Sequence, residues 1–128
     1  MEFKELKNLI GNKLRDIYDA TVQQGITLEK QLNEDLPGVE WGVVAEWNGD
    51  INIYLMIQPL MDVPEGIDFT PYVSIDILPE IKIDCVIGVS KSDVEFMKEH
   101  KGLMKDENIA VYYETMYRLL DYMNKMEV

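Results

Sequence analysis

The sequence predicts one α+β domain covering residues 1–128. We expect a long N-terminal helix, a four-stranded, mostly antiparallel sheet made of two hairpins, and two C-terminal helices packed on one face of the sheet. Two patterns predict this fold. Apolar residues recur every three or four positions near both ends of the chain, as in helices that bury one face. Between them, four runs alternate apolar and polar residues, as half-buried strands do.

The N-terminal helix is predicted from Phe3 to about Gln24. Gly25 is expected to end it, because glycine is the commonest residue just past a helix. Thr27 then caps a short second helix that ends at Pro37. The apolar stripe of the first helix consists of Phe3, Leu6, Ile10, Leu14, Ile17 and Thr21, and that of the second of Leu28, Leu32 and Leu36.

The first predicted hairpin surrounds Asn48-Gly49-Asp50, with alternating apolar residues from Trp41 to Trp47 and from Ile51 to Ile57. A two-residue Asn-Gly turn would pair Trp47 with Asp50 and mix the two faces of the sheet. A three-residue loop instead pairs Trp47 with Ile51 and keeps the apolar residues on one face. We prefer that register, because a shift by one residue turns a buried face outward.

The second predicted hairpin joins the strand of Val73, Ile75 and Ile77 to the strand of Ile81, Ile83, Cys85, Ile87 and Val89. If Ile75 lies opposite Cys85, Asp76 stands across from Asp84 on the outer face. Two carboxylates held this close together would bind a metal ion or act as a general acid/base pair. Lys82 shares that face and relieves the repulsion, so an ordinary solvated face is the preferred interpretation.

Two helices are predicted at the C-terminal end. Ser92 and Glu95 have the spacing of a capping box and open a short helix that ends near Gly102. His100 is expected to cap carbonyl groups at its end. The last helix runs from about Asp106 to Met126. Its predicted buried face consists of Ile109, Tyr112, Tyr113, Met116, Leu119, Leu120 and Met123.

A second, partly apolar flank of the last helix predicts a contact with another copy or a partner. Flexible methionines in the same third of the chain suit such adaptable surfaces. The residues expected to form this oligomer interface are Val111, Thr115, Tyr122 and Met126.

The negative charge is unevenly distributed. The net charge is −12, and residues 25–100 account for −11 of it, with fifteen acids against four bases. Solubility and protection of strand edges are one interpretation. The other is a negative surface that steers a basic protein partner towards it. The acids expected to form that surface are Glu40, Glu46, Asp50, Asp62, Glu65, Asp68, Asp76, Glu80 and Asp84.

Composition and motifs argue against several function classes. A pI near 4.4 disfavours direct binding to nucleic acid or to an anionic membrane. One histidine and one cysteine, Cys85, are too few for a zinc site, and no calcium, phosphate or nucleophile motif occurs. We therefore expect no cofactor, no metal and no catalytic residue. A single cysteine and a charged N-terminus favour the cytoplasm.

These observations leave three hypotheses. The first is a non-catalytic inhibitor or adaptor whose acidic surface docks on a basic protein, with carboxylates imitating nucleic-acid charge. The second is a dimeric secretion or assembly chaperone. The third is a small enzyme or small-ligand binder that uses Asp76 and Asp84 or the loop of residues 62–68. In size, acidity and order of elements, though in no specific residue, the chain is similar to type III secretion chaperones, toxin-immunity proteins and phage-encoded inhibitors of host defence.

Overall fold

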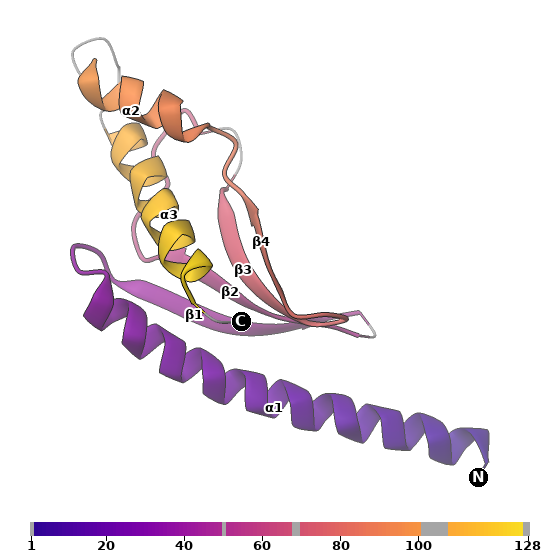
Figure 1. Cartoon of the computed structure of the whole chain (residues 1–128). Coiled ribbons are helices and arrows are strands. Elements are labelled where there is room, and N and C mark those ends of the chain that lie inside the picture. The colour runs from indigo at the N-terminus through magenta and orange to yellow at the C-terminus, as the bar shows by residue number, and fades with distance from the viewer. Residues whose placement is uncertain (1, 50, 68–69, 101–107, 127–128) are drawn as a thin grey trace.

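The computed structural model describes residues 2–49, 51–67, 70–100 and 108–126. One long helix, a sheet and two shorter helices follow one another along these residues, which confirms the predicted α+β class (Figure 1). The helices are α1 (Phe3–Asp35), α2 (Lys91–Glu99) and α3 (Asn108–Asn124). The strands are β1 (Trp41–Asn48), β2 (Asn52–Pro59), β3 (Tyr72–Leu78) and β4 (Lys82–Val86).

The four strands form one antiparallel sheet in the order β1-β2-β3-β4. Along the strands the odd-numbered residues face the helices, as the predicted alternation requires. These positions include the buried Ile53, Leu55 and Ile57 of β2 and the buried Val73 and Ile75 of β3. The helices therefore cover one face of the sheet. The even-numbered residues form a face that none of the described helices covers, although Leu60 packs over the buried Gly42 at the start of β1.

Both hairpin registers differ from the predicted ones by two residues. Trp47 pairs with Ile53 rather than with Ile51, and the last pair of the first hairpin is Asn48 with Asn52. In the second hairpin Ile75 pairs with Ile83 rather than with Cys85. A shift of two leaves every side chain on its predicted face, so the alternation that identifies the strands cannot distinguish the two registers.

The predicted break at Gly25 is wrong, because α1 continues without interruption from Phe3 to Asp35. Gly25 instead lets the helix approach the sheet closely. A Cβ atom at this position would lie 3.0 Å from Leu55 Cδ2 and 3.6 Å from Val43 Cγ1. The glycine is therefore explained by packing against the sheet rather than by helix termination.

Side chains of α1 bind the free edge of β1. The amide of Asn33 accepts a hydrogen bond from Trp41 N at 2.8 Å and donates to Trp41 O at 3.2 Å. Glu29 accepts from Val43 N at 3.1 Å, and the Tyr18 hydroxyl lies 3.4 Å from the carbonyl oxygen of Ala45. These contacts satisfy backbone groups that an edge strand would otherwise expose.

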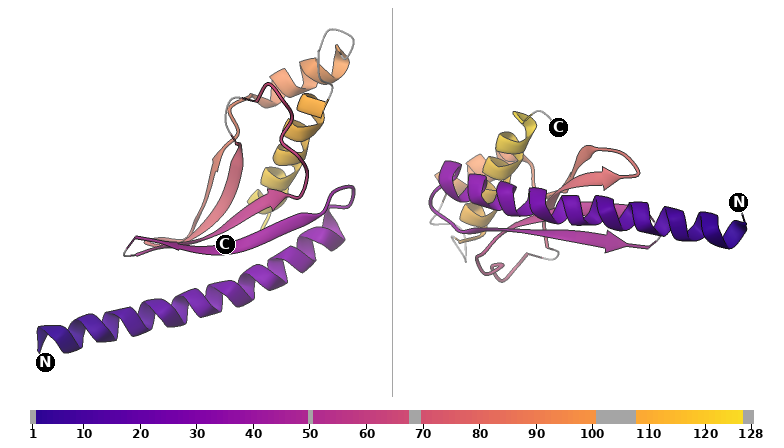
Figure 2. Two further views of the ribbon diagram at one scale, coloured as in Figure 1. Left: turned by 180° about the vertical axis from the view of Figure 1, so that it is seen from behind. Right: turned by 90° about the horizontal axis from the view of Figure 1, so that it is seen from below.

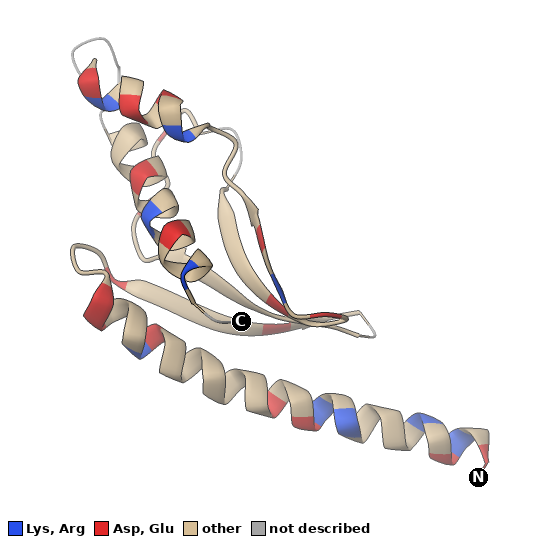
Figure 3. Ribbon diagram, viewed as in Figure 1, with Lys and Arg blue, Asp and Glu red and all other residues tan. Residues whose placement is uncertain are grey.

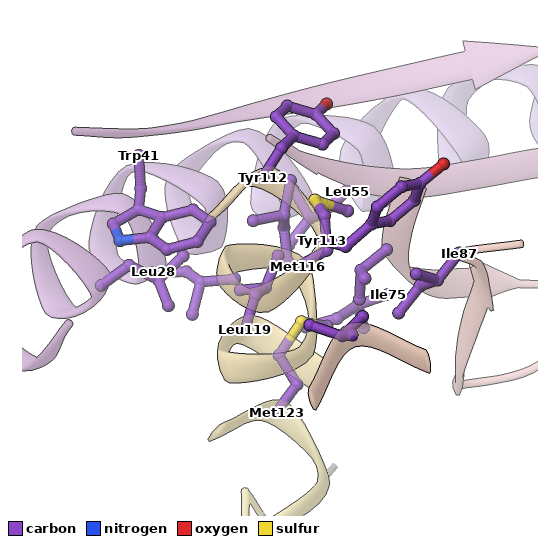
Figure 4. Close-up of a cluster of buried hydrophobic side chains, with 14 residues drawn as sticks. Leu28, Trp41, Leu55, Ile75, Ile87, Tyr112, Tyr113, Met116, Leu119 and Met123 are labelled. Atoms are coloured by element: carbon purple, nitrogen blue, oxygen red, sulfur yellow. The ribbon is translucent and has the colours of Figure 1, made fainter. Parts of the chain in front are cut away.

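The core lies between the sheet and both α1 and α3 (Figure 4). Trp41 is fully buried, and its indole nitrogen donates to Leu36 O at 3.0 Å. Five of the seven α3 residues predicted to be buried are buried, and Ile109 and Leu120 are partly buried against the same cluster. The five are Tyr112, Tyr113, Met116, Leu119 and Met123.

The N-cap of α2 lies two residues before the predicted one. Ser90, not Ser92, is the N-cap, and its hydroxyl accepts a hydrogen bond from Asp93 N at 3.2 Å. At the other end His100 is the C-cap, with Nδ1 2.9 Å from Phe96 O, as predicted. Gly102 and Asp106, the predicted helix boundaries, lie outside the described residues.

The two glycines of α1 should respond differently to the same substitution. Gly25→Val forces carbon atoms against Leu55 and Val43, and we expect it to lower the free energy of unfolding by about 2 kcal/mol. Gly11→Val meets open space, with no atom within 4 Å of an added Cβ, and should change it by less than about 0.5 kcal/mol. Urea unfolding followed by tryptophan fluorescence measures both. Equal losses would contradict the packing role of Gly25.

Removal of the Asn33 amide should destabilise the protein, because Trp41 N and O lose their edge partner. We expect Asn33→Ala to lower the free energy of unfolding by about 1–2 kcal/mol. Asn12→Ala removes an exposed amide from the same helix and should have little effect. Hydrogen exchange of the Trp41 amide provides an independent measurement, since it should quicken in Asn33→Ala alone.

Candidate functional site

The uncovered face of the sheet is the candidate site, and we call it the open face. Two rows of paired residues cross all four strands on this face. One row runs Glu46–Tyr54–Asp76–Lys82, and the next runs Val44–Met56–Ser74–Asp84. Because side chains in one row are neighbours, carboxylates and apolar groups from distant parts of the sequence lie side by side here.

Exposed apolar side chains accompany the carboxylates of the open face. Val44 is 47% exposed and Val86 is 45% exposed, whereas Tyr54 and Met56 are half-buried. Ser74, between Met56 and Asp84, is buried. The face therefore combines exposed apolar area with negative charge.

The predicted acidic surface divides into two groups. Glu46, Asp76 and Asp84 lie on the open face, with Glu80 in the turn between β3 and β4, and Figure 3 shows most of them towards one end of the sheet. Glu40, which precedes β1, lies six residues from Glu46, or about 20 Å along an extended strand.

The second group lies around the start of β1. The loop after β2 begins there, because Leu60 N donates to Glu40 O at 2.7 Å, and this loop contains the exposed Asp62 and Glu65. Asp50 and Asp68 are outside the described residues. The described acids therefore form two clusters at different places rather than one continuous surface.

The expected opposition of Asp76 and Asp84 is wrong. Asp76 pairs with Lys82, and Asp84 pairs with Ser74. The register shift of two residues places a cation, not a second carboxylate, across from Asp76. Lys82 Nζ also lies 3.9 Å from Glu80 Oε1. The direct opposition of two carboxylates that suggested a metal or acid/base pair is therefore absent from this pair of strands.

Tyr72 reports on the electrostatics of the open face. Partial desolvation raises the pKa of its phenol, and the nearby carboxylates of Asp84 and then Asp76 raise it further. A negative phenolate is disfavoured beside these negative charges. The two carboxylates, although not directly opposed, therefore act on the same part of the surface.

A pocket that the sequence analysis missed lies between α1 and the sheet. It has a volume of about 220 Å³ and is lined on the α1 side by Gln24, Thr27, Leu28 and Gln31. The sheet side is apolar, with Leu55, Ile75, Ile77 and Ile81, and Met126 completes it. The sequence analysis placed Ile81 in a strand, whereas the structure places it before β4, where it is 61% exposed.

The predicted oligomer flank of α3 is largely engaged within the chain. Thr115 is buried, and its hydroxyl donates to Val111 O at 2.8 Å. Tyr122 donates to Asp35 Oδ2 at 2.7 Å, and this hydrogen bond raises the pKa of the phenol. Met126 packs against the core, which leaves Val111, at 49% exposed, as the member presented to solvent. The interface itself stays a prediction.

Other chemical candidates lie apart from the open face. Cys85 is half-buried and packs against the core, and His100 stacks on Phe96 with ring centres 4.0 Å apart. Among the described residues, no three His, Cys, Asp or Glu side chains are grouped so as to hold a metal ion. Nor is any helix in the described ranges both long and apolar enough to cross a membrane.

Comparison with known proteins gives no relative. No family model, no curated protein and no solved structure matches this chain.

Neutralising the open-face carboxylates should lower the pKa of Tyr72. We expect Asp84→Asn to lower it most and Asp76→Asn to lower it less, because both charges disfavour the phenolate. Titration of ζ-¹³C-tyrosine signals by NMR resolves this group from the other tyrosines. Asp62→Asn, in the loop after β2, serves as the matched control and should leave the Tyr72 titration unchanged.

Proposed function

We propose that this protein is a non-catalytic binding protein, an inhibitor or adaptor, whose open face docks on a basic protein partner. The observation that carries this proposal is the arrangement of one covered and one uncovered face. All of the packed helices use the odd-numbered face, so the even-numbered face presents Val44, Val86 and three carboxylates to solvent.

The chemistry of the open face defines the kind of partner. Carboxylates accelerate encounter with a positively charged surface and orient it, while apolar side chains supply the area that holds it. The partner should therefore present lysines or arginines beside apolar groups. A nucleic-acid-binding enzyme is a natural candidate, because carboxylates imitate the phosphates that it recognises. A cytoplasmic location belongs to the same proposal.

The pocket between α1 and the sheet supports a second candidate function. Its apolar walls and volume of about 220 Å³ suit one or two apolar side chains of a bound segment. A secretion or assembly chaperone holds its client through such contacts. This function would depend little on salt, whereas docking through the open face would weaken as ionic strength rises.

Reversing charges on the open face should abolish capture of the partner. We compare Glu46→Lys/Asp84→Lys with Glu40→Lys/Asp62→Lys, because each pair changes the net charge from −12 to −8, two units for each reversal. Immobilised wild-type and variant proteins capture binders from an extract of the native host at low salt, and mass spectrometry quantifies them.

The proposal predicts a protein that the wild type and the Glu40/Asp62 variant retain and the open-face variant loses. Its retention should fall steeply as salt is raised. Equal loss from both variants would attribute binding to net charge alone, and unchanged capture by the open-face variant would exclude this face. If Ile77→Glu abolished capture of a protein whose retention did not change with salt, binding would be attributed to the pocket instead.

A further inference from the structure

The N-terminal part of α1 carries an apolar stripe that no described part of its own chain covers. The stripe repeats with steps of three, four and four residues from Phe3 to Leu36, so it keeps one direction along the whole helix. Near the C-terminal end its members Leu28 and Leu32 are buried. Towards the N-terminus burial declines through the half-buried Leu14, and Ile10 is 50% and Phe3 82% exposed.

The sheet ends before the helix does. The eight residues of β1 span about 26 Å, whereas the 33 residues of α1 span about 50 Å. Figures 1 and 2 show the N-terminal part of α1 extending beyond the hairpins in each view. We call residues 3–13 the arm. A short helix in water is marginally stable by itself, so an arm with an apolar stripe needs a surface to pack on.

The charges beside the stripe indicate what covers it. The row of side chains on one side of the stripe consists of Lys4, Lys7, Gly11 and Arg15 and contains no acid, whereas the row on the other side consists of Glu2, Glu5, Leu9, Lys13 and Asp16. Figure 3 shows these basic segments on the projecting part of α1. Two arms packed antiparallel against each other would bring the basic rows together, and like charges would repel. The basic row is therefore complementary to an acidic surface.

We propose that the arm docks on the open face of a second copy of this chain, reciprocally, in a two-fold symmetric dimer. The stripe faces from the helix layer towards the sheet layer. The two copies are related by a two-fold axis that lies in the plane of the sheet, just beyond the first hairpin. Rotation about this axis exchanges the two sides of the sheet in the second copy, so that the open face of each copy lies beneath the arm of the other.

The dimensions and the chemistry of the two surfaces agree. The eleven arm residues span about 16 Å, and the strand segment from Val44 to Asn48 spans about 13 Å. This part of the open face presents Val44 and Met56 to the apolar stripe and Glu46 to the basic row. The apolar stripe of the arm and this part of the open face are both buried in one arrangement.

This inference uses the same open face as the proposed function, and it adds a regulatory element. A basic partner would have to displace the arm of the second copy, because both require Glu46 and Val44. Weakening the arm should therefore release the open face for an external partner. The inference and the proposed function can fail separately, because the first is measured on the pure protein and the second in a host extract.

The test is the mass of the pure protein in solution. Analytical ultracentrifugation should give twice the chain mass of 14.9 kDa for the wild type and 14.9 kDa for Ile10→Glu. Ile26→Glu makes the same change at an exposed residue on the opposite side of α1 and should remain dimeric. Circular dichroism should show both variants folded, since Ile10 and Ile26 are exposed in the monomer.

A charge exchange identifies the surface that receives the arm. We expect Lys7→Glu and Glu46→Lys each to raise the dimer dissociation constant about tenfold or more, and the double variant to return it to within about threefold of the wild type. Tighter dimerisation of Lys7→Glu with no effect of Glu46→Lys would mean that the arms pair with each other, and it would overturn the proposal.

Other outcomes would overturn the proposal in favour of another occupant or interface. A monomeric wild type would exclude a second copy. If that monomer bound anionic phospholipid vesicles and Ile10→Glu did not, the arm would be a membrane-binding segment. A dimer that survives Ile10→Glu but dissociates in Val111→Glu would place the interface on α3 instead.

Discussion

The attachment of α1 to the edge of β1 is the constraint on which the rest of the structure depends. Asn33 and Glu29 bind backbone groups of Trp41 and Val43, and Gly25 lets the helix lie close against Leu55. Once α1 is fixed along this edge, its stripe and α3 share one face of the sheet. The opposite face is left bare, and the N-terminal part of α1 has no sheet beneath it.

The fold class and the face occupied by each strand residue could be predicted, because alternation with period two identifies both. The pairing partners could not. Trp47 lies opposite Ile53 and Asp76 opposite Lys82, each two positions from the expected partner, and an apolar pattern is unchanged by a shift of two. That small difference removed the direct opposition of Asp76 and Asp84, which was one of the two sites considered for an enzyme.

The helix pattern was misread at Gly25 for a related reason. A glycine after a periodic stretch is the usual sign of a helix end, and only the distance to Leu55 shows that this one permits close packing. The exposure of the arm was equally inaccessible, because a stripe in the sequence does not reveal where the supporting sheet stops. Charge density along the sequence likewise could not show that Glu40 and Glu46 belong to different clusters.

The asymmetry between the two sheet edges limits how copies of this chain can join through their strands. At β1 the backbone groups of Trp41, Val43 and Ala45 are already bonded to α1 side chains, whereas β4 forms the other end of the sheet. A strand can therefore be added at β4 but not at β1. Head-to-tail addition, which would build an open fibre, has no receiving edge, so any strand-to-strand association ends as a closed pair.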